Sequence, residues 1–491
     1  MATKILSAQQ IKWIDAYTIE HKPITSEALM EHASLQCVAA FLPYLSSRSI
    51  IHLFCGPGNN GGDGFVIGRI LQKMGYDIRM YFLAFGKPTP ECAAAKDRAL
   101  PVNDLFSPAD FPDIRPAEIV IDALLGVGTS RKPEGLLQAL IQHINNSNAK
   151  VLSVDLPSGM AADAVPEHDT IIRAAVTATF QQPKLVFFLE ETLPYIGEWK
   201  VLNIGLDEQE IERQPARYFH LDAESIRQLI VPRARFSHKG TYGHGLLIAG
   251  SKGKMGSAVL ASKSALRSGI GLLTAHVPGI GLNVLQTAVP EAMCSSDVKE
   301  GYISEAGDLS SYSAIGIGPG LGKHHDSLDV LKAVLLAGKP IVIDADALNL
   351  LAEHTVLLEQ LPEETILTPH PKEFERLAGA SVSSTDRLDR LVHFAQTYRC
   401  TVILKDAITA IATKEGRVFF NTTGNPGMAT GGTGDVLTGI VLGLLAQGYT
   451  VENAAQIAVY HHGLAGDKAA AKHGEAGLIA GDLVEFLAID K

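Results

Sequence analysis

The chain has 491 residues, of which 46% are hydrophobic and 19% charged, and its mean hydropathy is +0.13. This length is natural for two compact domains, and the composition excludes an intrinsically disordered protein. The net charge of −11 argues against nucleic acid as a general partner, although it leaves room for local phosphate sites.

The cysteine content indicates the compartment. The five cysteines are scattered, odd in number and without a C-x-x-C pair, so they indicate neither a disulfide framework nor a zinc site. The start of the chain has no apolar segment typical of a signal peptide, and the longest apolar run, residues 440–446, is too short to span a bilayer. We therefore expect a cytoplasmic enzyme with no membrane partner.

The first half of the chain alternates helical and β-rich segments. Ser7-x-x-Gln10 is typical of a capping box that opens a helix reaching about Glu20, and a second helical pattern covers residues 26–45. This rhythm predicts a doubly wound, Rossmann-like α/β domain with a largely parallel sheet. The β-rich runs cover residues 50–55, 77–85, 118–122, 150–155, 176–180 and 199–204.

The composition changes at residues 207–217, which are charged and contain a proline. We place the domain boundary near residues 215–225 and assign residues 1–218 to the first domain and 223–491 to the second. The alternation resumes in the second half and predicts another α/β domain. Its β-rich runs cover residues 245–250, 271–277, 314–318, 340–344, 365–368 and 401–404.

A glycine-rich motif follows the first β-rich run of the first domain: Gly56-Pro-Gly-Asn-Asn-Gly-Gly-Asp-Gly64. It contains G-x-G-x-x-G, so a dinucleotide-binding dehydrogenase has to be considered. That function needs an acidic residue at the end of the next strand, and residues 84–87, Ala-Phe-Gly-Lys, offer none. Two asparagines and an aspartate on one turn exceed what helix capping requires, which favours a ligand site over a plain turn.

Two more polar motifs stand at strand ends. Asp122 and Asp155 each close a β-rich run, and Ser158 follows shortly after the second. The carboxyl ends of strands in a doubly wound sheet line one crevice, so these residues could converge with Asn60. Oxygen ligands without His or Cys favour an alkali or alkaline-earth cation, although each aspartate alone could equally be a turn former.

Together, Asn59-Asn-Gly-Gly-Asp-Gly64, Asp122-Ala-Leu-Leu-Gly-Val-Gly128 and Val154-Asp-Leu-Pro-Ser-Gly159 resemble the NAD(P)H-hydrate epimerase family. That family has a Rossmann-like fold and interconverts the R and S epimers of NADHX and NADPHX, the hydrated forms of NADH and NADPH. The resemblance implies that Asp155 transfers protons and that potassium binds to Asn60, Asp122 and Ser158. It also implies that the substrate contacts Asn59, Asn60, Gly61, Gly62, Asp63, Gly126, Val127, Gly128, Thr129, Ser130, Arg131, Lys132 and Asp155.

In the second domain, polar and glycine-rich segments again follow β-rich runs. Ser251-Lys-Gly-Lys-Met-Gly-Ser-Ala258 and Gly316-Ile-Gly-Pro-Gly-Leu-Gly322 would let a large substrate approach the backbone. His370, between two prolines, should be pinned at the functional edge of the sheet. Lys405 could place a point charge near a phosphate chain, or it could be an exposed turn lysine.

The stretch Gly424-Asn-Pro-Gly-Met-Ala-Thr-Gly-Gly-Thr-Gly-Asp435 leads into an apolar helical segment. Glycines at a helix start let several N–H groups point at one anion, and the helix dipole adds to the attraction. Asp435 could be a helix cap or a base poised beside a phosphate. The residues around it leave both possibilities open.

With Thr368-Pro-His-Pro-Lys-Glu373, this stretch resembles the ribokinase-like superfamily and, within it, the ADP-dependent NAD(P)HX dehydratases, over about residues 223–490. The resemblance implies phosphorylation of the hydrate by ADP with Mg²⁺, loss of phosphate, and AMP as a product. Asp435 would be the base, and the amides of Gly432, Thr433 and Gly434 would hold the phosphoryl group. Hydrate contacts would come from Ala258, Gly320, His370 and Asp435, and nucleotide contacts from Lys405, Asp406, Ala407, Ile408, Thr409, Gly432, Thr433 and Gly434.

Two alternatives remain at this point. One is a ribokinase-like kinase of a small alcohol fused to a nucleotide-binding module, and the other gives the first domain a purely regulatory role. His324-His325 and His461-His462 lack metal-ligand spacing and are interpreted as structural or surface residues. By analogy with dehydratases of this kind, we also expect a homo-oligomer.

Overall fold

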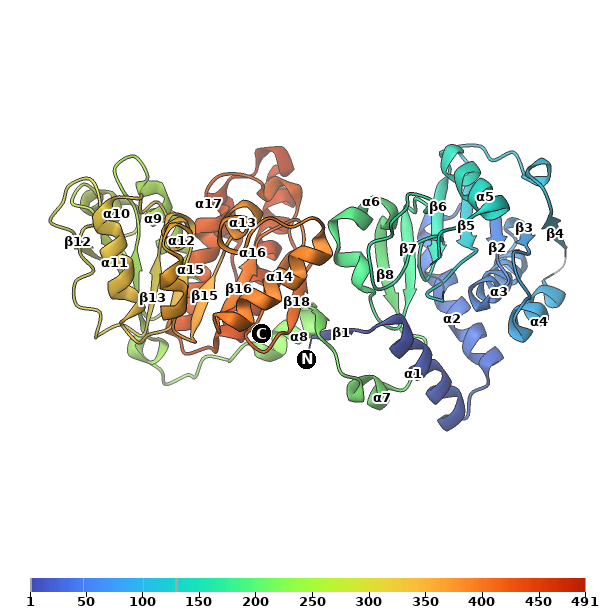
Figure 1. Ribbon diagram of the computed structural model, residues 1–491, viewed down its shortest axis with the longest axis horizontal. Coiled ribbons are helices and arrows are strands. Elements are labelled where there is room, and N and C mark those ends of the chain that lie inside the picture. Colours follow the sequence, from blue (N-terminus) through green and yellow to red (C-terminus); the bar gives the residue numbers. More distant parts are fainter. Residues whose placement is uncertain (1, 47, 100, 129–130, 491) are drawn as a thin grey trace. The chain divides into compact units, whose positions relative to one another are not determined.

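A computed structural model of the protein describes residues 2–490, except residues 47, 100, 129 and 130. The chain divides into an N-terminal unit, Lys4–Ala216, and a C-terminal unit, Arg217–Lys491 together with the segment that ends at Thr3. Each unit is built on a largely parallel sheet with helices around it (Figure 1), which confirms the predicted α/β fold class.

The sheet of the N-terminal unit has seven parallel strands in the order β4-β3-β2-β5-β6-β7-β8. In this doubly wound order the sheet is extended first to one side of β2 and then to the other, so a crevice opens at the carboxyl ends of β2 and β5. The strands are β2 (Ile50–Cys55), β3 (Asp77–Leu83), β4 (Val102–Leu105), β5 (Ile119–Ala123), β6 (Lys150–Val154), β7 (Val176–Phe180) and β8 (Glu198–Leu202). The helices are α1 (Ala8–His21), α2 (Ser26–Phe41), α3 (Asn59–Lys73), α4 (Pro90–Arg98), α5 (Gly135–Asn146), α6 (Leu193–Ile196) and α7 (Glu208–Arg213).

Both faces of this sheet are covered, which explains its nearly continuous apolar strands. Successive side chains of a strand point to opposite faces. Ile51 and Leu53 accordingly belong to the hydrophobic cluster formed with α2 and α3, whereas Phe54 belongs to the cluster formed with α5. The sheet is therefore held rigidly between two cores, and its carboxyl edge carries the loops.

The C-terminal unit contains an 11-stranded sheet in the order β1-β9-β18-β17-β16-β15-β14-β13-β10-β11-β12. From β12 to β16 all neighbouring strands are parallel, and β17 pairs antiparallel with both β16 and β18. The strands are β1 (Thr3–Ile5), β9 (Tyr218–His220), β10 (His244–Ile248), β11 (Leu272–Val277), β12 (Met293–Ser296), β13 (Ala314–Ile317), β14 (Ile341–Ile343), β15 (Thr365–Leu367), β16 (Thr401–Leu404), β17 (Thr409–Ala412) and β18 (Val418–Asn421). The helices are α8 (Ala223–Leu229), α9 (Met255–Arg267), α10 (Gly281–Ala288), α11 (His325–Leu335), α12 (Ala345–Glu353), α13 (Pro371–Ala378), α14 (Ser384–Thr397), α15 (Thr433–Ala446), α16 (Val451–His473) and α17 (Ala480–Phe486).

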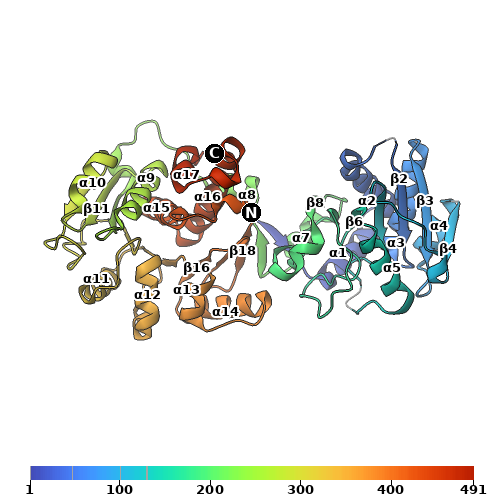
Figure 2. The ribbon, with the colours of Figure 1, turned by 90° about the horizontal axis from the view of Figure 1, so that it is seen from above.

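Helix α15 lies at the centre of the C-terminal unit. All residues from Val436 to Ala446 are buried, so the helix is apolar on every side, as expected for a core helix. In Figure 2, α9, α15, α16 and α17 lie on one face of the sheet and α11 to α14 on the other. The position of α15 is therefore fixed by packing all around it, and so is the direction in which its N-terminus points.

The cysteines and the apolarity of the helices were both considered in the sequence analysis. All five cysteines are free thiols in the structure, and four of them are buried. Within the described part of the chain, no helix combines the length and apolarity needed to cross a membrane.

Candidate functional site

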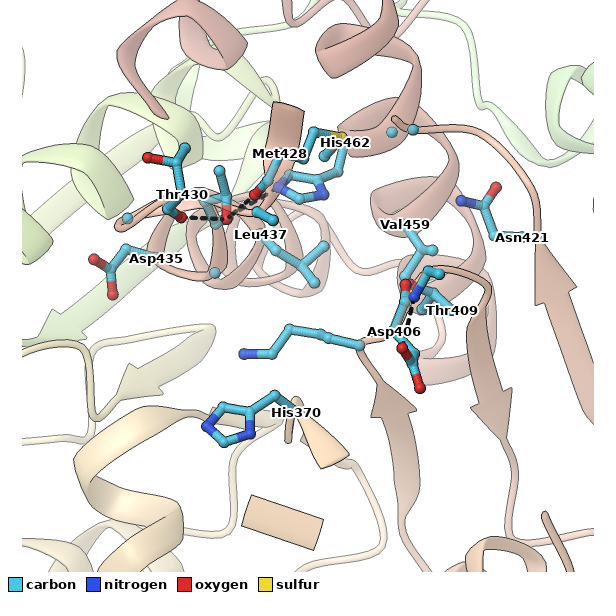
Figure 3. Close-up of a pocket in the computed structure, with 18 of the residues that line it drawn as sticks. His370, Asp406, Thr409, Asn421, Met428, Thr430, Asp435, Leu437, Val459 and His462 are labelled. Atoms are coloured by element: carbon cyan, nitrogen blue, oxygen red, sulfur yellow. Dashed lines mark hydrogen bonds between the residues drawn. The ribbon is translucent and has the colours of Figure 1, made fainter. Parts of the chain in front are cut away.

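The C-terminal unit has a cavity of about 1020 Å³ at the carboxyl edge of its sheet. The glycine-rich stretch that ends at Asp435 forms one wall, and the segments after β14, β15 and β16 contribute to the others. Figure 3 shows Asp435 at one end and Asp406, Thr409 and Asn421 at the other, with His370 facing the glycine-rich wall. This volume lies at the upper end of the range for ligand pockets, and can hold more than one substrate.

The start of α15 is an uncapped helix N-terminus. Gly432, its N-cap residue, has φ +96° and ψ −11°, a left-handed conformation that favours glycine, and it makes no side-chain capping bond. The first-turn amides of Thr433, Gly434 and Asp435 have no partners within the helix, so they can bind an anion. Asp435 lies inside the first turn rather than at the N-cap, which rules out its reading as the N-cap residue.

Asp435 has an unusual electrostatic environment. Burial and the neighbouring Asp344 carboxylate raise the pKa of Asp435 to about 6, against the lowering effects of a hydrogen bond with Ser257 and the charge of Lys405. A carboxylate that titrates near neutral pH is well suited to accept a proton from a hydroxyl group. The side chain therefore combines a partly buried position at the cavity, beside the anion site, with a basicity suited to a general base.

A buried ion pair supports the floor of the cavity. Lys405 Nζ lies 2.9 Å from Asp344 Oδ1, and Thr438 Oγ1 donates a 2.7 Å hydrogen bond to Asp344 Oδ2. Asp344 is only 1% exposed, so its charge needs these partners. The sequence identified Lys405 but gave Asp344 no role. Its place directly after β14, at the same sheet edge as His370, is the signal that could have found it.

The glycine-rich wall is braced from behind by α16. His462 Nε2 donates a 2.9 Å hydrogen bond to the carbonyl of Thr433, and burial lowers the pKa of His462 to about 4, so the ring is neutral. Asp467 accepts 3.0 Å hydrogen bonds from the Gly424 amide and from Asn425 Nδ2. The expectation that His462 is structural or superficial needs refining, because this residue lines the cavity and fixes the helix start.

Most of the predicted dehydratase residues lie at this cavity. His370 caps α13 through Nδ1, which accepts a hydrogen bond from the Glu373 amide at 3.3 Å, so its ring is held in place.

Two of the predicted hydrate contacts do not line the cavity. Ala258 is fully buried and packs near Gly250, and Gly320 is buried in the loop after β13. Ser257 rather than Ala258 offers its side chain to Asp435. The predicted residues that line the cavity are His370, Lys405, Asp406, Ala407, Thr409, Gly432, Thr433, Gly434 and Asp435, whereas Ile408 is absent from its lining.

The N-terminal unit carries a second site at the crevice between β2 and β5. Helix α3 begins at Asn59, inside the glycine motif, and its N-cap Gly58 makes no side-chain capping bond. The predicted turn is thus partly helical, and it presents first-turn amides to the crevice. Gly61 packs so tightly against the Gly56 carbonyl that a Cβ would lie 1.8 Å from that oxygen. Only glycine allows this approach of helix and loop.

Buried oxygen atoms cluster beside this helix start. Asp122 accepts hydrogen bonds from Ser158 Oγ at 2.5 Å, from the Ser158 amide at 2.8 Å and from Ser153 Oγ at 2.9 Å. Asn60 Nδ2 donates to the Leu125 carbonyl at 2.8 Å, which leaves Asn60 Oδ1 buried with no hydrogen-bond partner among the described atoms. Ser158 Oγ lies 3.4 Å from the same Leu125 carbonyl, so Asn60, Ser158 and Asp122 border one loop, and this all-oxygen donor set fits a hard cation.

Asp155 occupies a strained position at the end of β6. Its φ of +65° lies in the left-handed region, which residues other than glycine rarely adopt. Strained backbone conformations of this kind cluster at functional sites. Lys184 Nζ lies 3.1 Å from Asp155 Oδ1, and it donates to the carbonyls of Phe180 and Gln182 at 2.9 Å each. Lys184 is fully buried, so its ammonium group holds the carboxylate in one orientation. The sequence reading missed Lys184, although it closely follows β7 at the same sheet edge.

Two further carboxylates adjoin Asp155. Burial and the charge of Asp155 raise the pKa of Asp15 to about 7, and the same two causes raise the pKa of Asp63. Asp63 is a predicted substrate contact and is 7% exposed. The site thus contains one carboxyl group, that of Asp15, whose pKa lies near neutral pH, a property that suits proton transfer.

The loop after β5 carries the remaining predicted contacts. The Val127 amide donates to Asp155 Oδ2 at 3.4 Å, which brings this loop to the site. Gly126 packs against Asn60, and Gly128, Arg131 and Lys132 are exposed. The predicted contacts Thr129 and Ser130 lie outside the described residues.

These features define the class of protein. The C-terminal unit has the uncapped helix start, first-turn carboxylate and lysine expected of a phosphoryl-transfer enzyme, and the N-terminal unit has the crevice of a Rossmann-like sheet. A family model described as NAD(P)H-hydrate dehydratase matches residues 245–488, and one described as YjeF-related protein N-terminus matches residues 26–186.

Whole-chain relatives identify the family. A bifunctional NAD(P)H-hydrate repair enzyme Nnr from Moorella thermoacetica is 36% identical over 98% of this chain and 96% of its own length, and one from Coxiella burnetii is 34% identical over 99% of both. The chain belongs to the family of bifunctional NAD(P)H-hydrate repair enzymes. A solved ADP/ATP-dependent NAD(P)H-hydrate dehydratase from Bacillus subtilis is 34% identical, with a TM-score of 0.48 over 54% of this chain and 94% of its own.

Proposed function

We propose that the protein repairs hydrated nicotinamide cofactors with two activities. The N-terminal unit interconverts the R and S epimers of NADHX and NADPHX, and the C-terminal unit dehydrates the S epimer while ADP is cleaved to AMP and phosphate. The observation that carries this proposal is the uncapped start of α15, with Asp435 in its first turn, inside a chain similar over its whole length to bifunctional repair enzymes.

In the dehydratase reaction, Asp435 accepts the proton of the hydrate hydroxyl as its oxygen attacks the β-phosphorus of ADP and AMP leaves. The amides of Gly432, Thr433 and Gly434 stabilise the charge on the transferring phosphoryl group. Phosphate then departs with the electrons of the C–O bond, and loss of a ring proton restores the dihydronicotinamide. Phosphorylation makes a good leaving group out of hydroxide, so phosphoryl-transfer machinery serves a dehydration.

Among the predicted residues that line the cavity, His370 would contact the hydrate. The segment 405–409 would contact the nucleotide. Of these, His370, Lys405, Asp406, Ala407 and Thr409 face the cavity. Mg²⁺ would neutralise charge on the nucleotide phosphates. Because no group of three or more His, Cys, Asp or Glu side chains suited to a metal occurs among the described residues, phosphate oxygens would supply most of its ligands.

In the epimerase reaction, Asp155 transfers the proton of the hemiaminal hydroxyl while Lys184 fixes the carboxylate. Epimerisation at this carbon requires a proton to leave and return, which a positioned carboxylate accelerates by roughly 10²–10⁴. Asn60, Asp122 and Ser158 would hold a potassium ion, supported by the orphaned Asn60 Oδ1 and the all-oxygen donor set. Bound K⁺ would supply positive charge for the substrate beside the start of α3.

One assay tests both activities. Racemic NADHX is supplied with ADP and Mg²⁺, and the return of reduced-nicotinamide absorbance is followed. Complete conversion is expected in potassium chloride, whereas in tetramethylammonium chloride the trace should show a fast half and a slow half because only epimerisation needs K⁺. Conversion that stops near half in potassium would refute the epimerase assignment, and no conversion at all would refute the proposed function.

A kinase of a small alcohol fused to a non-catalytic module is less well supported. The Asp155, Lys184 and Asp122 sites of the N-terminal unit are complete, which a purely regulatory module would not need. Relatives that share both halves of the chain carry the repair-enzyme name. Transfer of phosphate from ADP or ATP to a simple alcohol, without action on NADHX, would favour the kinase instead.

We also propose a cytoplasmic homo-oligomer. Five free cysteines, four of them buried, suit a reducing compartment. Phe236 is 94% exposed and Val231 68% exposed on one segment, which supports a subunit contact there. Light scattering of the purified protein tests the assembly: a monomer at micromolar concentration would contradict it.

A further inference from the structure

Helix α1 precedes the doubly wound sheet and lies outside the residues matched by the family model, which begin at residue 26. It is nevertheless firmly attached to the N-terminal unit. Ile11 and Ile14 are buried in a hydrophobic cluster, and the Ala8 amide donates to both carboxylate oxygens of Asp163 at 3.0–3.2 Å. The helix is therefore fixed in rotation, and so is the face that it turns toward the epimerase site.

That face carries Lys12 and Asp15, which are three residues apart and hence neighbours on the helix surface. Lys12 Nζ lies 3.7 Å from the point that a Cβ on Gly128 would occupy, so the ammonium group stands directly over the loop after β5. Asp15, one turn further along, interacts with Asp155 and Lys184. Helix α1 thus reaches both the glycine loop and the proton-transfer group.

The charges of the site explain why a lysine is needed here. The carboxyl groups of Asp15, Asp63, Asp122 and Asp155 offer no positive charge to an anionic ligand. The ammonium of Lys184 is occupied by Asp155 and two carbonyls. A dinucleotide hydrate brings at least two negative charges on its diphosphate. Lys12 is exposed, and no described side chain forms an ion pair with it, so its charge is available to a ligand.

We propose that Lys12 binds a phosphate group of the hydrate as it lies along residues 126–128, so that helix α1 forms part of the epimerase substrate site. This inference rests on the proposed epimerase function and extends it to a residue outside the Rossmann-like core. A lysine is a compact point charge on a flexible stem and suits a phosphate whose exact position varies with the ligand. The phosphate belongs either to the diphosphate or to the 2′-position that distinguishes NADPHX from NADHX.

The test compares Lys12→Ala with the wild-type protein on the R epimer, with ADP and Mg²⁺ present so that dehydration reports epimerisation. We expect KM for the R epimer to rise roughly 10-fold, the loss typical of one charge-assisted hydrogen bond, with kcat within about 2-fold. An equal rise for both hydrates assigns the contact to the diphosphate. A rise for NADPHX alone assigns it to the 2′-phosphate. An unchanged KM for both overturns the proposal.

Lys73→Ala is the matched control. Lys73 is also an exposed lysine, but it lies in the last turn of α3, the end opposite to the site, so its removal should leave KM unchanged. A second readout does not depend on epimerisation. Acetic anhydride should label Lys12 several-fold more slowly in the presence of saturating NADPHX, as measured by mass spectrometry on the wild-type protein. If the epimerase assignment itself fails, protection still supports a phosphate contact at Lys12, and equal labelling refutes it.

Discussion

Asp435, the proposed base of the dehydratase reaction, is a residue at which function and stability conflict. Its pKa of about 6 lies above the ordinary value of 3.8, so the folded state binds this proton more tightly than the unfolded state. The contribution of Asp435 to stability is therefore most favourable below pH 4 and is lost as pH rises through 6. The cost at neutral pH is on the order of 2–3 kcal/mol for a shift of this size.

Replacing Asp435 with Asn should therefore separate the two properties. We expect Asp435→Asn to abolish dehydration and to raise the melting temperature of the C-terminal unit by several degrees at pH 8, with little change at pH 4. Calorimetry at both pH values measures the stability. In the wild-type protein the dehydration rate should rise about tenfold per pH unit below pH 6 and level off above it. A melting temperature lowered at pH 8, or retained turnover, would contradict the assignment.

The residues of both sites could be predicted in part. Motif residues such as Asp435, Asp155 and His370 stand in short glycine- or proline-rich segments after strands, and that local signal is readable. Lys184 and Asp344 carry no such signature, because their roles depend on partners 29 and 61 residues away in the chain: Asp155 and Lys405. Only the strand order brings these pairs together.

At the level of elements, the approach of α15 to α9 depends on a glycine. A Cβ on Gly439 would lie 2.1 Å from both the Ala261 carbonyl and Ser264 Oγ, so no side chain fits between the helices. We expect Gly439→Ala to destabilise the C-terminal unit by about 1–3 kcal/mol, because overpacking outweighs the better helix propensity of alanine. Thermal unfolding measures this. Gly256→Ala is the control for glycine replacement, because Gly256 also lies in a helix and a Cβ there would meet nothing within 4 Å. Unchanged stability of Gly439→Ala would refute the packing argument.

The central parallel strands are predicted well, and so is the edge strand β8, whereas the edge strands β4 and β12 are missed. Residues 50–55 and 176–180 match β2 and β7 to the residue, because both strands are almost fully buried and consist mainly of β-branched, aromatic and other apolar residues. The edge strands β4 and β12 were not predicted. Each has four residues, and most of them are at least partly exposed, so neither continuous apolarity nor a period of two marks them.

At the level of the whole molecule, the two sites are chemically linked but structurally separate. The residues described above for each site all belong to one compact unit. The R epimer becomes a substrate of the C-terminal unit only after the N-terminal unit has converted it. The fusion therefore supplies one epimerase unit for each dehydratase unit, and the two act in sequence on one damaged cofactor.

This arrangement predicts complementation between two inactive variants. Asp155→Ala should stall on the R epimer and Asp435→Asn should regenerate no cofactor, yet an equimolar mixture should convert racemic NADHX completely, because the S epimer diffuses from one protein to the other. The return of reduced-nicotinamide absorbance measures each case. We expect the mixture to approach half the wild-type rate, since each activity is present at half its concentration.

If the mixture stops near half conversion, as Asp155→Ala does alone, then either the epimer is passed only within one molecule or Asp435→Asn also disables epimerisation. Assay of Asp435→Asn with an added, separate dehydratase distinguishes these two outcomes.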